Sequence, residues 1–143
     1  MRFAKCVQFV AVLAVLAVPS FTGYVEARQQ PKLSSEAKAY MDYRKEVPKA
    51  KRLEDLYFYF DAKSVEYYKQ LNAAERAKIY MQLKSQVEMF PTFTVTNEER
   101  GLGPTIVTFS AKSTDNKEAI VAVEVIREGA ALRIGQASWK APQ

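Results

Sequence analysis

Residues 105–126 read TIVTFSAKSTDNKEAIVAVEVI, and apolar side chains recur at every second position on both sides of a polar interruption. The alternating apolar residues are Val107, Phe109 and Ala111, then Val121, Val123 and Val125. A period of two with β-branched residues is typical of strands that have one buried face. The polar stretch Ser113–Lys117 is short enough to join two such strands. The segment therefore predicts a β-hairpin.

The same period continues on either side of this hairpin. Phe93 and Val95 alternate with threonines before it, while Leu132 and Ile134 form a fourth stripe after it, with Trp139 near its end. The connections at 97–103 and 128–129 are short. We therefore expect a four-stranded antiparallel meander with one apolar face covered by helices and one wet face.

The residues before this sheet follow helical spacing. Four helices are expected: one capped by Ser34 or Ser35 and ended or kinked by Pro48, one over 53–60, one over 64–71, and one between Asn72 and Pro91. The last opens on Asn72-Ala-Ala-Glu75, a capping box. The predicted fold class is α+β, with N-terminal helices packed on a curved four-stranded antiparallel sheet.

The N-terminus has the pattern of a secretory signal peptide. Arg2 and Lys5 precede the apolar run Cys6–Val18, and Val25-Glu26-Ala27 offers a cleavage site. A membrane anchor is the alternative, but the run is shorter than the roughly 20 residues a span needs. We expect a signal peptide at 1–27, a disordered lead-in at 28–33 and one domain at 34–140. The protein would then be exported, periplasmic or extracellular, and not membrane-spanning after processing.

Composition excludes several kinds of site. The chain has no histidine, and its one cysteine, Cys6, belongs to the predicted signal. The usual ligands for zinc, copper and non-haem iron are then missing, as are histidine-based triads. No nucleotide-binding motif and no Gly-x-Ser-x-Gly motif occurs, so we assign no catalytic residue, metal or cofactor. A net charge of +5 is too small to indicate nucleic-acid binding.

Short helices followed by a curling sheet resemble the nuclear transport factor 2-like family, the cystatin-like α+β cone. Tyr40 in the first helix, the segment SVEYYKQL at 64–71 and GAALRI at 129–134 carry the resemblance. The last resembles the closing Gly-x-Trp-Lys-Ile strand of exported members, with Leu132 and Arg133 in place of Trp and Lys. The likeness spans about 34–140. It implies a conical pocket, and family members include isomerases, cyclases, dehydratases, assembly modules and many exported domains of unknown function.

In such a cone, inward strand positions and helix aromatics would line the pocket. The candidates are Tyr40, Tyr57, Phe60, Val107, Phe109, Val123 and Ile134. The family's enzymes would place an Asp, His or Tyr inside. Glu124 has the opposite strand parity and should face out. Asp42 on the first helix is the nearest carboxylate, with a solvated helix position as the alternative.

Two further segments have two interpretations each. Residues 56–60, LYFYF, predict either a pocket wall or partner surface, or a short helix buried on most sides. Residues 44–52, RKEVPKAKR, predict either a site for anionic glycans or lipid headgroups or a solvated interhelical corner. The candidate anion-binding residues are Arg44, Lys45, Lys49, Lys51 and Arg52.

Taken together, the sequence favours an exported, non-catalytic binding or assembly module of the cell envelope. Its partner would be a small apolar ligand or an envelope protein. A homodimer through the sheet is a further expectation, because Ile106, Ile120, Ala122 and Ile126 share the outer-face parity. The alternatives are an isomerase or cyclase that uses a carboxylate and tyrosines, and a small accessory to an envelope complex.

Overall fold

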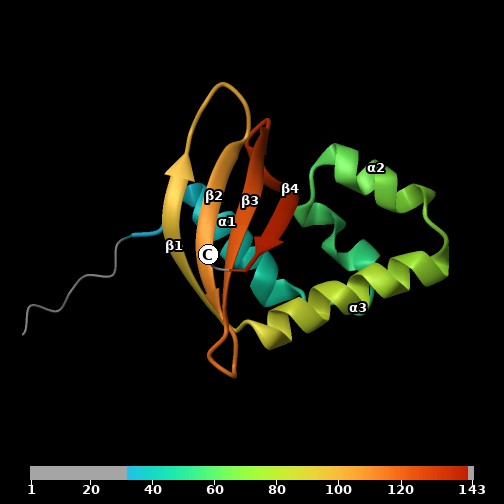
Figure 1. The fold of residues 1–143 in the computed structure, drawn as a ribbon. Helices are drawn as coiled ribbons and strands as arrows, with labels where there is room; N and C mark the ends of the chain where they lie inside the picture. The colour runs from blue at the N-terminus through green and yellow to red at the C-terminus, as the bar shows by residue number, and fades with distance from the viewer. Residues whose placement is uncertain (1–31, 142–143) are drawn as a thin grey trace, which may run out of the picture. The chain divides into compact units, whose positions relative to one another are not determined.

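The computed structural model describes residues 32–141, in which helices pack against one antiparallel sheet (Figure 1). The predicted signal peptide and most of the predicted lead-in lie outside the described residues. Within 32–141, no helix is both long enough and apolar enough to cross a membrane. The α+β class predicted from the sequence is confirmed.

The helices begin where the sequence places capping residues. Helix α1 spans Ser35–Glu46, and the Ser34 hydroxyl accepts a hydrogen bond from the Ala37 N–H. Helix α3, Ala73–Met89, opens on the predicted capping box of Asn72 and Glu75 and ends before Pro91. Between them, α2 covers Ala62–Gln70. These side-chain caps satisfy backbone N–H groups that a helix leaves unpaired.

The LYFYF segment belongs to a 3-10 helix, η1, at Leu53–Tyr59, rather than to an α-helix. The path of the chain after Tyr59 explains why this helix is short. Phe60 returns to extended backbone and forms a parallel bridge with Ile134 of the last strand. The segment is thus drawn into the edge of the sheet after a short, tight helix, a form usual for brief connectors.

The sheet is the predicted meander. Its strands are β1, Thr92–Glu99; β2, Thr105–Lys112; β3, Glu118–Glu128; and β4, Ala131–Lys140. They lie in the order β1-β2-β3-β4, and all three pairings are antiparallel. Gly129 in the β3–β4 turn has a φ of 61°, a left-handed conformation that glycine adopts without steric cost.

One face of the sheet forms the core with α1 and η1. The predicted inward residues of β2 and β3 are buried, and they pack with Tyr40 and Tyr43 of α1 and with Leu53 and Leu56 of η1. The register across β2 and β3 sets Val107 opposite Val123. The alternation read from the sequence is therefore correct through these two strands.

A β-bulge interrupts β4. Ile134 pairs with Val125 and Ala137 with Val123, so Gly135 and Gln136 together oppose Glu124 alone. A Cβ on Gly135 would lie 3.0 Å from Ile126 Cδ1 and 3.2 Å from Glu124 Oε2. The absence of a side chain at Gly135 thus lets Glu124 lie against the backbone of β4. Bulges of this kind occur often at sheet edges and beside binding sites.

Candidate functional site

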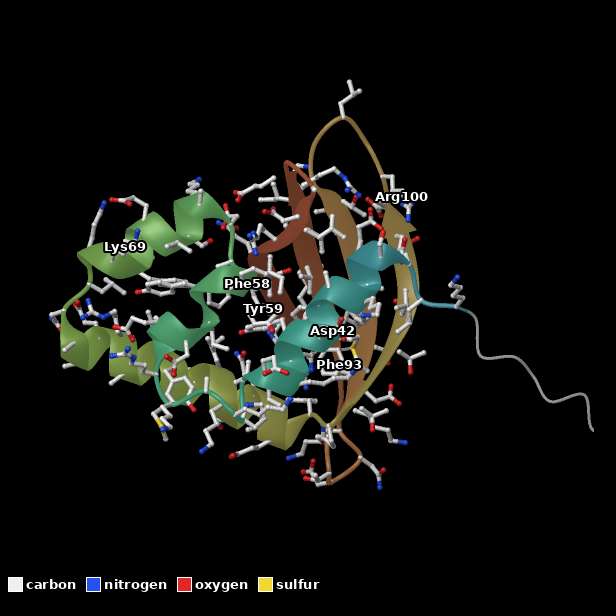
Figure 2. All side chains as sticks on the ribbon, turned by 180° about the vertical axis from the view of Figure 1, so that it is seen from behind. Asp42, Phe58, Tyr59, Lys69, Phe93 and Arg100 are labelled. Atoms are coloured by element: carbon white, nitrogen blue, oxygen red, sulfur yellow. The ribbon has the colours of Figure 1, made fainter. Side chains whose placement is uncertain are left out.

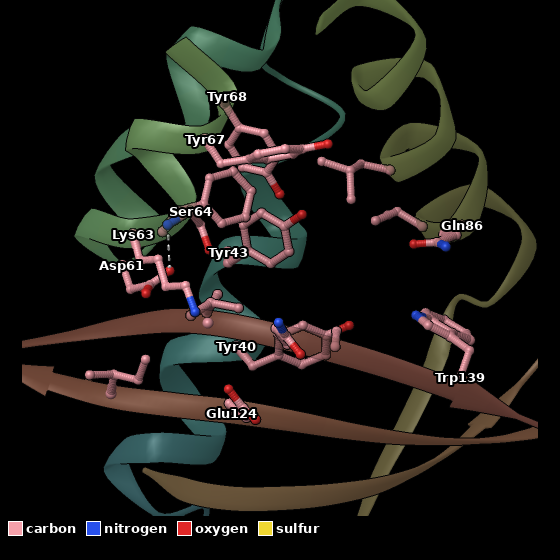
Figure 3. Close-up of a pocket in the computed structure, with 18 residues that line it drawn as sticks. Tyr40, Tyr43, Asp61, Lys63, Ser64, Tyr67, Tyr68, Gln86, Glu124 and Trp139 are labelled. Carbon is pink, nitrogen blue, oxygen red and sulfur yellow. Dashed lines mark hydrogen bonds between the residues drawn. The ribbon is translucent and has the colours of Figure 1, made fainter. Parts of the chain in front are cut away.

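A cavity of about 720 Å³ lies where the three α-helices approach β4 (Figure 3). Six aromatic side chains line it: Tyr40, Tyr43, Phe60, Tyr67, Tyr68 and Trp139. Aliphatic side chains of α3 and the sheet complete the apolar wall: Leu83, Val87, Ile126 and Ile134. The polar lining residues are Asp61, Lys63, Ser64, Gln86, Glu124 and Gln136.

Contacts between rings hold the aromatic wall together. Tyr40 and Tyr43 are three residues apart on α1, which places both on the same face of that helix. The ring centroids of Tyr43 and Phe60 lie 5.4 Å apart, and those of Phe60 and Tyr68 lie 5.3 Å apart. Such separations favour edge-on and tilted aromatic packing. The wall thus links α1, the end of η1 and α2 in one packed row.

Three tyrosines of the wall, Tyr40, Tyr43 and Tyr68, have raised pKa values and are neutral at physiological pH. Burial raises the pKa of Tyr40, and burial also raises the pKa of Tyr43 well above the ordinary range. The pKa of Tyr68 is raised by burial first and by the nearby charge of Asp61 second. Figure 3 shows Tyr43, Tyr67 and Tyr68 facing the cavity from α1 and α2. Their flat apolar rings and hydroxyl groups can contact a ligand in the cavity.

Asp61 is the carboxylate that sequence reasoning did not place in a pocket. It is only 6% exposed, and its side chain accepts a hydrogen bond from the Ser64 N–H at 3.2 Å as the cap of α2. Strand parity could not find Asp61, because it lies in the connection between η1 and α2. The sequence feature that could have drawn attention to Asp61 is its position three residues before Ser64, at the start of a predicted helix.

Asp42, the carboxylate candidate from the sequence, lies elsewhere. It lines a smaller cavity of about 230 Å³ with Phe58 and Tyr59 (Figure 2). Its carboxylate contacts the Lys38 ammonium at 2.5 Å and that of Lys45 at 3.3 Å. These hydrogen bonds lower the pKa of Asp42. A base of raised pKa is therefore not found at this position.

Of the seven predicted pocket residues, some line the main cavity and others do not. Tyr40, Phe60 and Ile134 line the main cavity. Val107, Phe109 and Val123 are fully buried in the core and do not line it. Tyr57 lies behind the wall, with its ring stacked on Tyr68 at a centroid distance of 6.3 Å.

Glu124 keeps the outward parity expected from the sequence, opposite Ile106 of β2, yet its side chain reaches the cavity. The reason is the bulge in β4, where Gly135 leaves the space beside it open. Alternation alone could not show this approach, because the bulge depends on how two strands pair.

Arg44 is buried rather than displayed for anions. It is 6% exposed, its guanidinium lies 3.6 Å from the centroid of the Phe93 ring, and it donates a hydrogen bond to the Phe90 carbonyl. Burial lowers the pKa of Arg44. The residue joins α1 to the segment between α3 and β1.

The other four candidate cations do not converge on one site. Lys45 pairs with Asp42, Lys49 with Glu46 at 2.7 Å, and Arg52 with Asp55 at 3.4 Å. The side chain of Lys51 is exposed. This arrangement has the features of a solvated corner of local ion pairs, each of which contributes little.

The LYFYF segment shares features of both interpretations. Leu56 and Phe60 are buried and Tyr57 and Tyr59 are half-buried, whereas Phe58 is 69% exposed. The Arg133 guanidinium lies 4.4 Å from the centroid of the Phe58 ring. Most of the segment is core, and one ring remains at the surface.

No family model matches the chain, and neither a curated protein nor a solved structure is significantly similar to it. Residues 32–141 contain no group of three or more acidic, cysteine or histidine side chains placed to hold a metal ion. The candidate site therefore has to be interpreted from its own geometry.

Proposed function

We propose that this protein is a non-catalytic binding module whose aromatic cavity receives the apolar part of a ligand. The observation that carries the proposal is the wall of six aromatic side chains around about 720 Å³. Sites for small ligands in proteins have volumes in this range, with mostly apolar walls and a few polar groups that orient the ligand.

The polar groups at the cavity support binding more than acid–base catalysis. Asp61 is engaged as the cap of α2, and the buried tyrosines stay neutral. Ser64, Gln86 and Gln136 can orient a ligand through hydrogen bonds without moving a proton. We therefore favour a binding or assembly role.

An isomerase or cyclase remains a second candidate because Asp61 lies close enough to Tyr68 for its charge to raise the pKa of that phenol. A carboxylate beside a neutral tyrosine can act as a base with a hydrogen-bond donor. This function requires turnover of a bound ligand that Asp61→Asn abolishes while binding persists.

We also propose that the protein is exported and that its fold is of the nuclear transport factor 2-like cone type. The signal pattern at the N-terminus supports the first statement. Helices that enclose a cavity against an antiparallel sheet support the second. We further propose a homodimer through the outer face of the sheet, supported by Ile120, which is 38% exposed on that face.

Trp139 provides the test of the cavity. It is the only tryptophan in the chain and lies in the cavity wall. Titration with the dye 8-anilinonaphthalene-1-sulfonate should quench Trp139 fluorescence saturably, by energy transfer to one bound dye molecule.

Two exposed aromatic residues make a matched pair of variants. Tyr67 is 57% exposed and lines the cavity, whereas Phe58 is 69% exposed and lies outside it. Tyr67→Ala should weaken dye binding about 3- to 10-fold, in line with the loss of one aromatic contact. Phe58→Ala should leave it unchanged. Absence of saturable binding, or equal losses in both variants, would refute the proposal.

A further inference from the structure

The cavity lies against a free edge of the sheet. β4 is the last strand in the sheet order and pairs with β3 on one side only (Figure 1). Its residues from Gly135 to Ala137, together with Trp139, line the cavity. Most of this half of β4 is exposed, from Gln136 to Ser138. An open row of backbone donors and acceptors thus borders the aromatic wall.

The chain itself covers only the start of this edge. Phe60 forms a parallel bridge with Ile134, and the Asp61 N–H donates to the Ile134 carbonyl at 3.0 Å. This is the only backbone hydrogen bond within residues 32–141 that reaches the outer edge of β4. After Asp61 the chain turns away into α2. Strand pairing therefore begins beside β4 and stops after one position.

The chemistry of such an edge limits what can fill the cavity well. A purely apolar ligand would cover backbone N–H and C=O groups without pairing them, and each unpaired buried group costs about 1–3 kcal/mol. An extended peptide backbone pairs them at the spacing that a strand repeats. Addition of a peptide strand to an exposed edge is a general mode of recognition, with pockets that select alternate side chains.

We propose that the ligand is an extended peptide segment of a partner protein, which adds as a fifth strand beside residues 135–139 of β4. The proposal rests on the binding role proposed above and names the chemistry of the ligand. A strand advances about 3.3 Å per residue, so this stretch matches about five residues of the guest. Alternate guest side chains, apolar or aromatic, enter the cavity between β4 and α3, against Leu83 and Val87.

Guest side chains of the other parity face the outer side of the sheet, where Glu124 lies beside Gly135. Glu124 takes part in none of the ion pairs found within residues 32–141. A basic side chain at this parity complements its charge. The preferred guest therefore alternates apolar residues with at least one lysine or arginine.

Selection from a displayed library of random linear heptapeptides on the purified protein tests this proposal. Enriched peptides should carry apolar residues at alternate positions, quench or shift Trp139 fluorescence, and displace 8-anilinonaphthalene-1-sulfonate. Methylation of single backbone nitrogens in the best peptide should weaken binding about 10-fold at one parity, where an N–H points to β4, and under about 2-fold at the other.

A matched variant tests the charge. Glu124→Gln should weaken peptides with a basic residue about 3- to 10-fold, and it should weaken peptides that lack a basic residue less than about 2-fold. Glu99→Gln, on the opposite edge strand, is the control and should change neither.

The outcomes separate the two proposals. If the dye binds but no peptide is enriched, or N-methylation acts equally at both parities, the peptide proposal is overturned and the binding module stands. If neither dye nor peptide binds, both fail. A concentration-dependent dimer whose β4 amides are protected from hydrogen exchange would assign the edge to a second copy of the chain and would also overturn the peptide proposal.

Discussion

Replacing Arg44 with methionine tests how the helical layer is joined to the start of the sheet. The substitution keeps an unbranched side chain but removes the hydrogen bond to the Phe90 carbonyl and the contact with the Phe93 ring. A hydrogen bond to a charged group contributes about 1.5–3 kcal/mol, and a desolvated cation–π contact adds about 1–2 kcal/mol. Release from the desolvation of the buried guanidinium offsets part of this. We expect a net loss of about 2–3 kcal/mol.

Urea unfolding followed by circular dichroism measures this loss, provided that the m-value is unchanged. Lys45→Met is the matched control, because it removes a neighbouring cation whose pair with Asp42 is exposed. It should cost less than about 0.5 kcal/mol. If the two variants unfold within about 0.5 kcal/mol of each other, Arg44 does not stabilise the fold in the way described.

Three other perturbations address the core, the tyrosines and the cap. Val123→Asp places an unpaired charge in the core and should cost several kcal/mol, enough to abolish a cooperative thermal transition. Thr108→Asp, on the half-buried outer face of the sheet, should cost much less. Similar thermal melts for the two variants would contradict the assignment of inner and outer faces in β2 and β3. The free energy of unfolding should change little between pH 6 and 8, because the chain lacks histidine. It should fall above about pH 10, because Tyr40 and Tyr43 lose their phenol protons in the unfolded chain at a lower pH than in the folded one. Tyr43→Phe should flatten this alkaline loss in melts recorded from pH 8 to 11, and an unchanged slope would count against it. Asp61→Ala should cost about 1 kcal/mol of stability in urea unfolding, because α2 loses its cap. Asp61→Ser, which can cap the helix, should restore most of this stability. Equal losses in the alanine and serine variants would show that capping is not the cause.

The sheet was predictable because its signal is local. Val107, Phe109, Val121 and Val123 alternate with polar or small residues, and each is fully buried. The helix caps were equally readable, since Asn72 and other capping residues bond within the next turn. η1 was less so. Its apolar spacing suits either helix type, and the bridge at Phe60 that shortens it depends on a strand far along the chain.

The cavity was predictable only in part, because it arises from tertiary packing. Strand alternation separates the two faces of a sheet, but it does not reveal a bulge such as that at Gly135, nor which helix stands beside the edge of β4. Charge patterning placed Arg44 with its neighbours in one cationic run. An arginine next to aromatic residues can be buried where a neighbouring lysine stays in water, because its flat, weakly hydrated group stacks on a ring.

The walls of the cavity include residues of both α1 and β4, the first and last elements among the described residues. A polypeptide that lacks β4 therefore lacks the strand edge and Trp139, and its site is incomplete. Occupancy must then stabilise the domain as a whole, by RT ln(1 + [L]/Kd) for a ligand at concentration [L]. Binding at this position reports that β4 has joined the folded domain, and a partner that recognises it distinguishes molecules in which β4 is paired from those in which it is not.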